Sequence, residues 1–208
     1  MEIATLIRTH NQRLYLAESL KAKCVSLLGG SVSILNTGDR SINYSQLFVL
    51  ALARALSSLT APYILVLEDD TDFCPRARIA LHTAVERGDS HNWYTIDTDS
   101  GVLERATYAP KFGYLLFGEH RVPFSGAVLV RRDLLQLFVE DYMLHFTEFE
   151  FPNVDICLSL FLSRRTGHLH LRPGYFFTKY GIESSITFSV QGRHAPAKQA
   201  TRYTGADV

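Results

Sequence analysis

The 208-residue sequence has no excess of charge of either sign, which removes one common basis for partner binding. Its 21 basic residues balance 21 acidic ones, so no overall field attracts nucleic acid or an anionic membrane surface. We therefore expect no nucleic-acid partner. Any anionic ligand has to be held by charges gathered at one place.

Cysteines and long apolar runs are also scarce. The three cysteines, Cys24, Cys74 and Cys157, are far apart and form no CxxC pair, so we interpret them as buried thiols in a reducing compartment. The longest apolar stretch, residues 47–59, is interrupted by Arg54 and is shorter than the roughly 20 residues that span a bilayer. The first residues do not have the pattern of a signal peptide. These absences predict a cytoplasmic protein without a transmembrane segment.

Apolar runs typical of strands alternate with runs of helical period. Strands are expected at residues 3–9, 32–36, 63–67 and 93–96, with two more between 108 and 130. Helices are expected at 14–28, 45–59, 76–87, 134–143 and 154–163. This order predicts an α/β fold in which a mostly parallel central sheet is flanked by helices, as one domain over residues 1–190. Residues 191–208 are polar and small, which is typical of a tail or of a linker to further domains.

Polar side chains follow the first three predicted strands, at the sheet edge where α/β proteins bind ligands. They are Thr9, His10, Asn11 and Arg13 after the first strand, Asp39 after the second, and Glu68, Asp69, Asp70 and Asp72 after the third. Four carboxylates behind a buried strand repel one another unless a cation neutralises them. Mg²⁺ or Mn²⁺ fits, because these ions take one or two carboxylates and complete their shell with phosphates and water. The alternative is an acidic loop that caps the next helix.

Two segments resemble a known family. LEDD at 67–70 is similar to the DxD-type motif of GT-A fold glycosyltransferases, in the EDD form of N-acetylglucosaminyltransferases, and TLIRTHNQR at 5–13 resembles their first strand and nucleotide-contacting loop. The resemblance implies a Rossmann-like GT-A domain in which Asp70 is the metal ligand. It also implies that Glu68 and Asp69 face the ribose and donor sugar and that Asp39 accepts a hydrogen bond from uracil. Because Asp70-Thr71-Asp72 is itself a DxD, Asp72 is a second candidate ligand.

Later segments resemble the acceptor side of the same family. Residues 123–138 are similar to the segment that lines the donor-sugar pocket, which implies sugar contacts at Ser125 and Gly126. Residues 171–186 resemble the strand and loop of the N-acetylglucosaminyltransferase IV type, a region in which GT-A enzymes often place a metal-binding histidine. The matching residue here is Lys179, which could instead pair with the diphosphate.

Asp155 stands at the start of a predicted helix, where the resemblance implies the general base of an inverting transfer; Glu150 is the second choice. A carboxylate at this position can also be explained by the helix dipole alone.

The sequence thus predicts a metal-dependent glycosyltransferase that uses Mn²⁺ or Mg²⁺, takes its sugar from a nucleotide sugar, with a UDP-sugar favoured, and passes it to a glycan acceptor. Its small size resembles GT-A modules of bacteria and large algal viruses. Two alternatives stay open. A nucleotidyltransferase usually carries a glycine-rich loop after the first strand, and THNQR has no glycine. A non-catalytic nucleotide-sugar- or carbohydrate-binding module needs no base.

Overall fold

The computed structural model describes residues 2–38, 44–87, 91–95, 107–109, 114–116, 127–145, 154, 158, 161–162, 167–171 and 176–178. The helices are η1 (Asn11–Arg13, a 3₁₀ turn), α1 (Leu14–Leu27), α2 (Tyr44–Ser58), α3 (Ala77–Arg87) and α5 (Arg132–His145). The strands are β1 (Ile3–Thr9), β2 (Val32–Asn36), β3 (Tyr63–Glu68), β4 (Thr71–Phe73), β5 (His91–Thr95), β6 (Thr107–Ala109), β7 (Tyr114–Leu116), β8 (Ala127–Arg131), β9 (Gly167–Leu171) and β10 (Phe176–Thr178).

Eight strands form one mixed sheet in the order β2-β1-β3-β8-β5-β9-β7-β6. β1 lies parallel to both β2 and β3, and β5 lies parallel to β9. β8 is antiparallel to β3 and β5, and β7 is antiparallel to β6 and β9. Apart from β8 and β7, all strands of this sheet therefore point the same way, which confirms the predicted α/β fold with a mostly parallel sheet.

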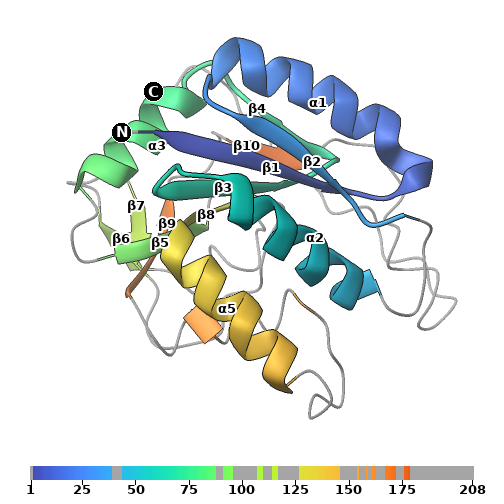
Figure 1. Cartoon of the computed structure of the whole chain (residues 1–208). Helices are drawn as coiled ribbons and strands as arrows, with labels where there is room; N and C mark the ends of the chain where they lie inside the picture. Colours follow the sequence, from blue (N-terminus) through green and yellow to red (C-terminus); the bar gives the residue numbers. More distant parts are fainter. Residues whose placement is uncertain are drawn as a thin grey trace, which may run out of the picture.

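Helices cover both faces of the sheet (Figure 1). Side chains alternate between the faces, as they must along a strand. Leu6 of β1 packs in the cluster that includes α2 and α5, and Ile7 packs in the cluster that includes α1 and α3. Because both faces are buried, β3 from Ile64 to Leu67 and β8 from Ala127 to Val130 are apolar at every position, which is why these segments read as continuous hydrophobic runs.

The structure corrects the sequence prediction in two places. Two strands were expected between residues 108 and 130, but three lie in this part of the chain, β6, β7 and β8, with β6 beginning at Thr107. The small second sheet of β4 and β10 was not expected. β4 has three residues, and its register with β10 pairs Phe73 with Phe176, so no local pattern could indicate it. The two rings, with centroids 5.5 Å apart, help to hold this sheet together.

Among the described helices, none is long and apolar enough to cross a membrane. The predicted tail at 191–208 and the domain boundary at 190 lie outside the described residues.

Candidate functional site

The turn between β3 and β4 forms the centre of the candidate site. β3 ends at Glu68, Asp69 and Asp70 make the turn, and β4 leaves the main sheet to pair with β10. The backbone N–H of Asp69 donates to the carbonyl of Arg8 at 3.1 Å, which holds the turn against the end of β1. Asp69 and Asp70 are only 3% and 8% exposed. Two adjacent buried carboxylates need partners to offset their desolvation.

Thr9 and Arg13 supply those partners from the end of β1. The Thr9 hydroxyl donates to Oδ2 of Asp69 at 2.6 Å. Nη2 of Arg13 lies 2.7 Å from Oδ1 of Asp69 and 2.8 Å from Oδ2 of Asp70. Burial raises the pKa of Asp69, opposed by the Thr9 bond and the Arg13 charge. Desolvation lowers the pKa of Arg13, but its bond to Asp70 and the charges of Asp69, Asp70 and Glu68 outweigh this, so the pKa lies above its ordinary value.

One oxygen of Asp70 is left without a partner in the described part of the chain. Its Oδ1 is buried and has no hydrogen-bond partner within the part of the chain that the structure describes. An oxygen of this kind is the donor that Mg²⁺ or Mn²⁺ prefers, and such ions bind with one or two carboxylates. No three acidic, histidine or cysteine side chains among the described residues gather around one point as a complete protein cage would require. The donor set therefore fits an ion that takes one or two protein ligands and the rest of its shell from a phosphate-bearing ligand.

Asp72, the second candidate ligand, is engaged by α1. Lys23 forms an ion pair with its Oδ1 and donates to the carbonyl of Phe73 at 2.8 Å. The backbone N–H of Phe73 donates to the same Asp72 oxygen at 2.8 Å, and the Lys23 ammonium lies 4.8 Å from the Phe73 ring centroid. The sequence prediction missed Lys23. Lys23 precedes the buried Cys24 in α1, and this position alone does not indicate a contact with Asp72.

Glu68 pairs with its neighbour on β1. Arg8 and Glu68 are opposite each other in the β1–β3 register and form an ion pair. Arg8 is 4% exposed, and its guanidinium carbon lies 5.3 Å from the ring centroid of Phe48 on α2. This pair belongs to the α2 side of the sheet, and Thr9 with Asp69 belongs to the α1 side.

The loops after β1 and β2 are joined by a set of hydrogen bonds. Nδ2 of Asn36 donates to Oδ1 of Asn11 at 2.8 Å, and the Gly38 N–H donates to Oδ1 of Asn36 at 2.9 Å. The backbone N–H of Asn11 also donates to the Gly38 carbonyl at 2.9 Å. His10, between these loops and Thr9, is buried. The two strand ends that the sequence predicted to meet are therefore held together.

Five predicted site residues lie outside the described residues: Asp39, Ser125, Gly126, Asp155 and Lys179. For three of them, the neighbouring described residue lies at the edge of the sheet that holds the acidic turn. Asp39 follows Gly38 in the sequence. Ser125 and Gly126 precede Ala127, which pairs with Leu67 near the end of β3.

The other two residues also adjoin described neighbours. Lys179 follows Thr178, which pairs with Thr71 directly after the acidic turn. Asp155 follows Val154, whose N–H donates to the Ser45 hydroxyl in the first turn of α2 at 3.2 Å.

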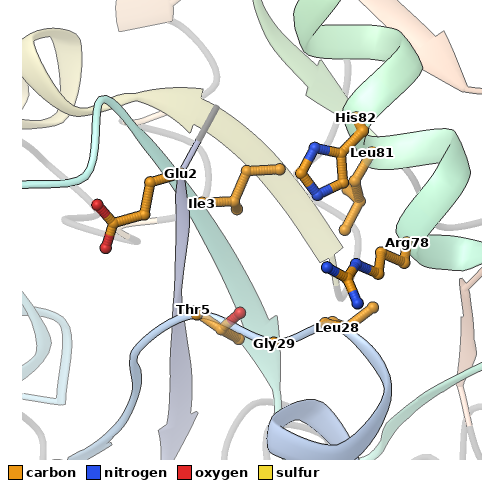
Figure 2. A pocket seen from close by; sticks show the side chains of 9 residues that line it. Glu2, Ile3, Thr5, Leu28, Gly29, Arg78, Leu81 and His82 are labelled. Atoms are coloured by element: carbon orange, nitrogen blue, oxygen red, sulfur yellow. The ribbon is translucent and has the colours of Figure 1, made fainter.

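A small pocket lies elsewhere, near the start of β1. It is lined by Glu2, Ile3, Thr5, Leu28, Gly29, Gly30, Arg78, Leu81 and His82. Figure 2 shows Arg78 and His82 extending from α3 toward β1 and the Gly29 turn. Because Glu2 and Ile3 stand at the opposite end of β1 from Thr9, this pocket is separate from the acidic turn.

Comparison with known proteins identifies the fold. No known family pattern matches the sequence, and no curated protein matches it. A glycosyltransferase involved in glycosylation of the major capsid of PBCV-1 has a similar structure, with a TM-score of 0.53, 12% identity, and coverage of 88% of this chain and 96% of that one. The chain has the GT-A glycosyltransferase fold.

Two further solved structures match less closely. Glucosyl-3-phosphoglycerate synthase from Mycobacterium tuberculosis, in complex with Mn²⁺ and UDP-glucose, has a TM-score of 0.48 at 13% identity, covering 90% of this chain and 73% of that one. A197 from STIV has a TM-score of 0.45 at 11% identity, covering 83% and 82%.

Proposed function

We propose that this protein is a metal-dependent glycosyltransferase that moves a sugar from a nucleotide sugar, with a UDP-sugar favoured, to a hydroxyl of a glycan or another acceptor. One observation carries the proposal. Thr9, Arg13, Asp69 and Asp70 converge at the carboxyl ends of β1 and β3, and one buried oxygen of Asp70 is left without a described partner. The GT-A fold is consistent with this chemistry, but a fold alone does not assign it.

The reaction sets the charges that the site must handle. The leaving group is a nucleoside diphosphate, whose negative charge grows as its bond to the anomeric carbon breaks. When bound, Mg²⁺ or Mn²⁺ stabilises that charge. Asp70 is the proposed ligand, because its Oδ1 is buried and has no hydrogen-bond partner among the described residues. Asp72 is proposed as a structural partner of Lys23.

Arg8 holds Glu68, and Thr9 with Arg13 holds Asp69, so both carboxylates are fixed for hydroxyl groups of the ribose and donor sugar. A carboxylate whose oxygens are fixed accepts hydrogen bonds in a defined direction, which favours one orientation of the donor.

The residues outside the described ranges keep the roles that the family resemblance implies. Asp39 binds uracil, Ser125 and Gly126 contact the donor sugar, and Lys179 pairs with the diphosphate. His10 and Asn11 complete the nucleotide contacts. Three described neighbours support these roles, because each lies close to the candidate site. Gly38 precedes Asp39 and bonds to the loop after β1, Ala127 follows Gly126 and pairs with the end of β3, and Thr178 precedes Lys179 and pairs with Thr71.

Asp155 is the proposed general base of an inverting transfer. Its carboxylate takes the proton of the acceptor hydroxyl while the acceptor oxygen bonds to the anomeric carbon. The bond from that carbon to the diphosphate oxygen breaks in the same step, and the nucleoside diphosphate leaves as an anion. The hydrogen bond between Val154 and Ser45 supports this role. Ser45 lies in the first turn of α2, which follows β2, and the carboxyl end of β2 is at the sheet edge of the candidate site.

The test is release of nucleoside diphosphate from a panel of nucleotide sugars, with and without Mn²⁺. We expect metal-dependent release that Asp70→Asn abolishes and that Asp155→Asn slows by roughly 10²- to 10⁴-fold. Glu140→Gln, an exposed carboxylate change on α5, is the control and should retain full activity.

Other outcomes favour the alternatives. Release of pyrophosphate from a nucleoside triphosphate favours a nucleotidyltransferase. Tight binding of a UDP-sugar without turnover, with acceptors present, favours a binding module.

A further inference from the structure

Arg13 is placed between the two carboxylates of the acidic turn. It ends η1, and its backbone N–H donates to the His10 carbonyl at 2.9 Å, so the backbone beneath the side chain is fixed. The side chain is 14% exposed, and one nitrogen, Nη2, contacts both Asp69 and Asp70. The guanidinium is therefore the counter-ion of both carboxylates of the turn.

This cluster is satisfied only in part. Nε of Arg13 and Oδ1 of Asp70 are both buried, and neither has a hydrogen-bond partner among the described residues. A buried donor or acceptor left without a partner costs about 1–3 kcal/mol. The Nε–H of Arg13 can donate to an anion and Oδ1 of Asp70 can bind a cation, and the two groups belong to side chains that contact each other.

We propose that Arg13 couples the binding of the divalent cation to the binding of the donor's diphosphate, an inference that rests on the proposed function. Without metal, Arg13 neutralises Asp70. As a cation binds Asp70, Arg13 gives up that carboxylate, and its guanidinium becomes the partner of the incoming diphosphate.

Charge accounting gives the reason for the coupling. Asp69 and Asp70 already share one positive charge, so a divalent cation added alone loses the Arg13–Asp70 pair and leaves the turn with excess positive charge. A diphosphate restores the balance and gives the guanidinium two or more oxygens to bind. Metal and nucleotide should therefore each raise the affinity for the other by the same factor.

The test measures Mn²⁺ binding by electron paramagnetic resonance at fixed pH, with and without UDP. It compares wild type, Arg13→Gln, Arg13→Lys and the control Arg54→Gln, which changes an exposed residue of α2. We expect Arg13→Gln to bind Mn²⁺ alone about fivefold or more tightly than wild type, the lower end of typical coupling. We also expect UDP to improve its Mn²⁺ affinity by a smaller factor. Arg13→Lys keeps the charge and should bind Mn²⁺ alone as weakly as wild type, and Arg54→Gln should match wild type in both measurements.

The outcomes separate the inference from the function on which it rests. If wild type binds Mn²⁺ and UDP but Arg13→Gln binds Mn²⁺ alone no more tightly, the coupling role of Arg13 is wrong and the proposed function stands. If wild type binds neither, the proposed function itself fails.

Folding of Arg13→Gln is checked first by circular dichroism. If this variant does not fold, the test moves to Arg13→Lys. Lysine cannot make the planar, bidentate contact of arginine with a diphosphate, so UDP should then improve Mn²⁺ affinity less than in wild type. An undiminished UDP effect in Arg13→Lys would overturn the inference.

Discussion

Thr9 and Asp69 are 60 positions apart in the chain, yet the Thr9 hydroxyl donates a 2.6 Å hydrogen bond to the Asp69 carboxylate. Both residues are buried, at 1% and 3% exposure. The bond joins the end of β1 to the acidic turn after β3, so the proposed ligand site depends on the parallel pairing of these strands.

Replacing Thr9 with valine tests this bond. Valine keeps the shape but leaves one Asp69 oxygen without its donor, so we expect the free energy of unfolding in urea to fall by about 1–3 kcal/mol. Thr9→Ser retains the hydroxyl and should lose less. A Thr9→Val variant as stable as wild type would show that the bond contributes nothing to stability.

The Lys23–Asp72 pair predicts a measurable coupling between α1 and β4. Lys23→Met and Asp72→Asn, alone and together, form a double-mutant cycle in thermal or urea unfolding. We expect a coupling energy of about 0.5–1 kcal/mol, because both side chains are partly exposed. A coupling energy of zero would mean that Asp72 is not held by Lys23 in solution.

Two glycines with the same backbone conformation predict different costs for the same substitution. Gly30 and Gly38 have φ values of 76° and 77°. A Cβ at Gly30 would lie 2.4 Å from the carbonyl oxygen of Ile3, whereas one at Gly38 meets no atom of the described residues within 4 Å. Gly38→Ala should cost only the strain of the left-handed conformation, about 1 kcal/mol. Gly30→Ala adds a backbone clash and should cost more in urea unfolding. Equal losses would contradict the close approach of Gly30 to β1.

Cys24 predicts a dependence of stability on alkaline pH. Burial raises the pKa of this thiol from 9.0 to about 12. The folded protein keeps the proton after the unfolded chain has lost it. The thiol's contribution to stability is therefore complete below pH 9 and is lost as the pH rises toward about 12.

The measurement for Cys24 is the difference in unfolding free energy between wild type and Cys24→Ala as a function of pH. This difference should shrink by up to about 1.4 kcal/mol per pH unit above pH 9. A difference that stays constant through this range would show that Cys24 ionises equally in both states.

Sequence patterns were sufficient to predict the bounds of helices and strands that are marked by a hydrophobic period within the segment itself. The predicted strands at 3–9 and 32–36 have the bounds of β1 and β2, and the predicted helix at 14–28 differs from α1 by one residue. Between α1 and β2, the hydrophobic period and the Gly29-Gly30 turn both place the end of the helix at the same point. The β4–β10 sheet could not be predicted, because its stability comes from a pairing between segments about 100 residues apart.

The candidate site was predictable in its location but not in its internal pairing. Parallel strands bring their carboxyl ends together, so Thr9, Arg13, Asp69 and Asp70 were expected at one edge. Which carboxylate keeps an open oxygen depends on side-chain packing. Lys23 engages Asp72 from α1, and one sequence does not reveal that contact.

The most direct measurement is anomalous diffraction from crystals of the protein grown with Mn²⁺ and UDP. The proposed function predicts a manganese peak at Asp70 when UDP is bound, and the coupling inference predicts in addition that Arg13 contacts the UDP phosphates instead of Asp70. A peak bonded to Asp72 and not to Asp70, or no manganese at the acidic turn when UDP is bound, would contradict the account.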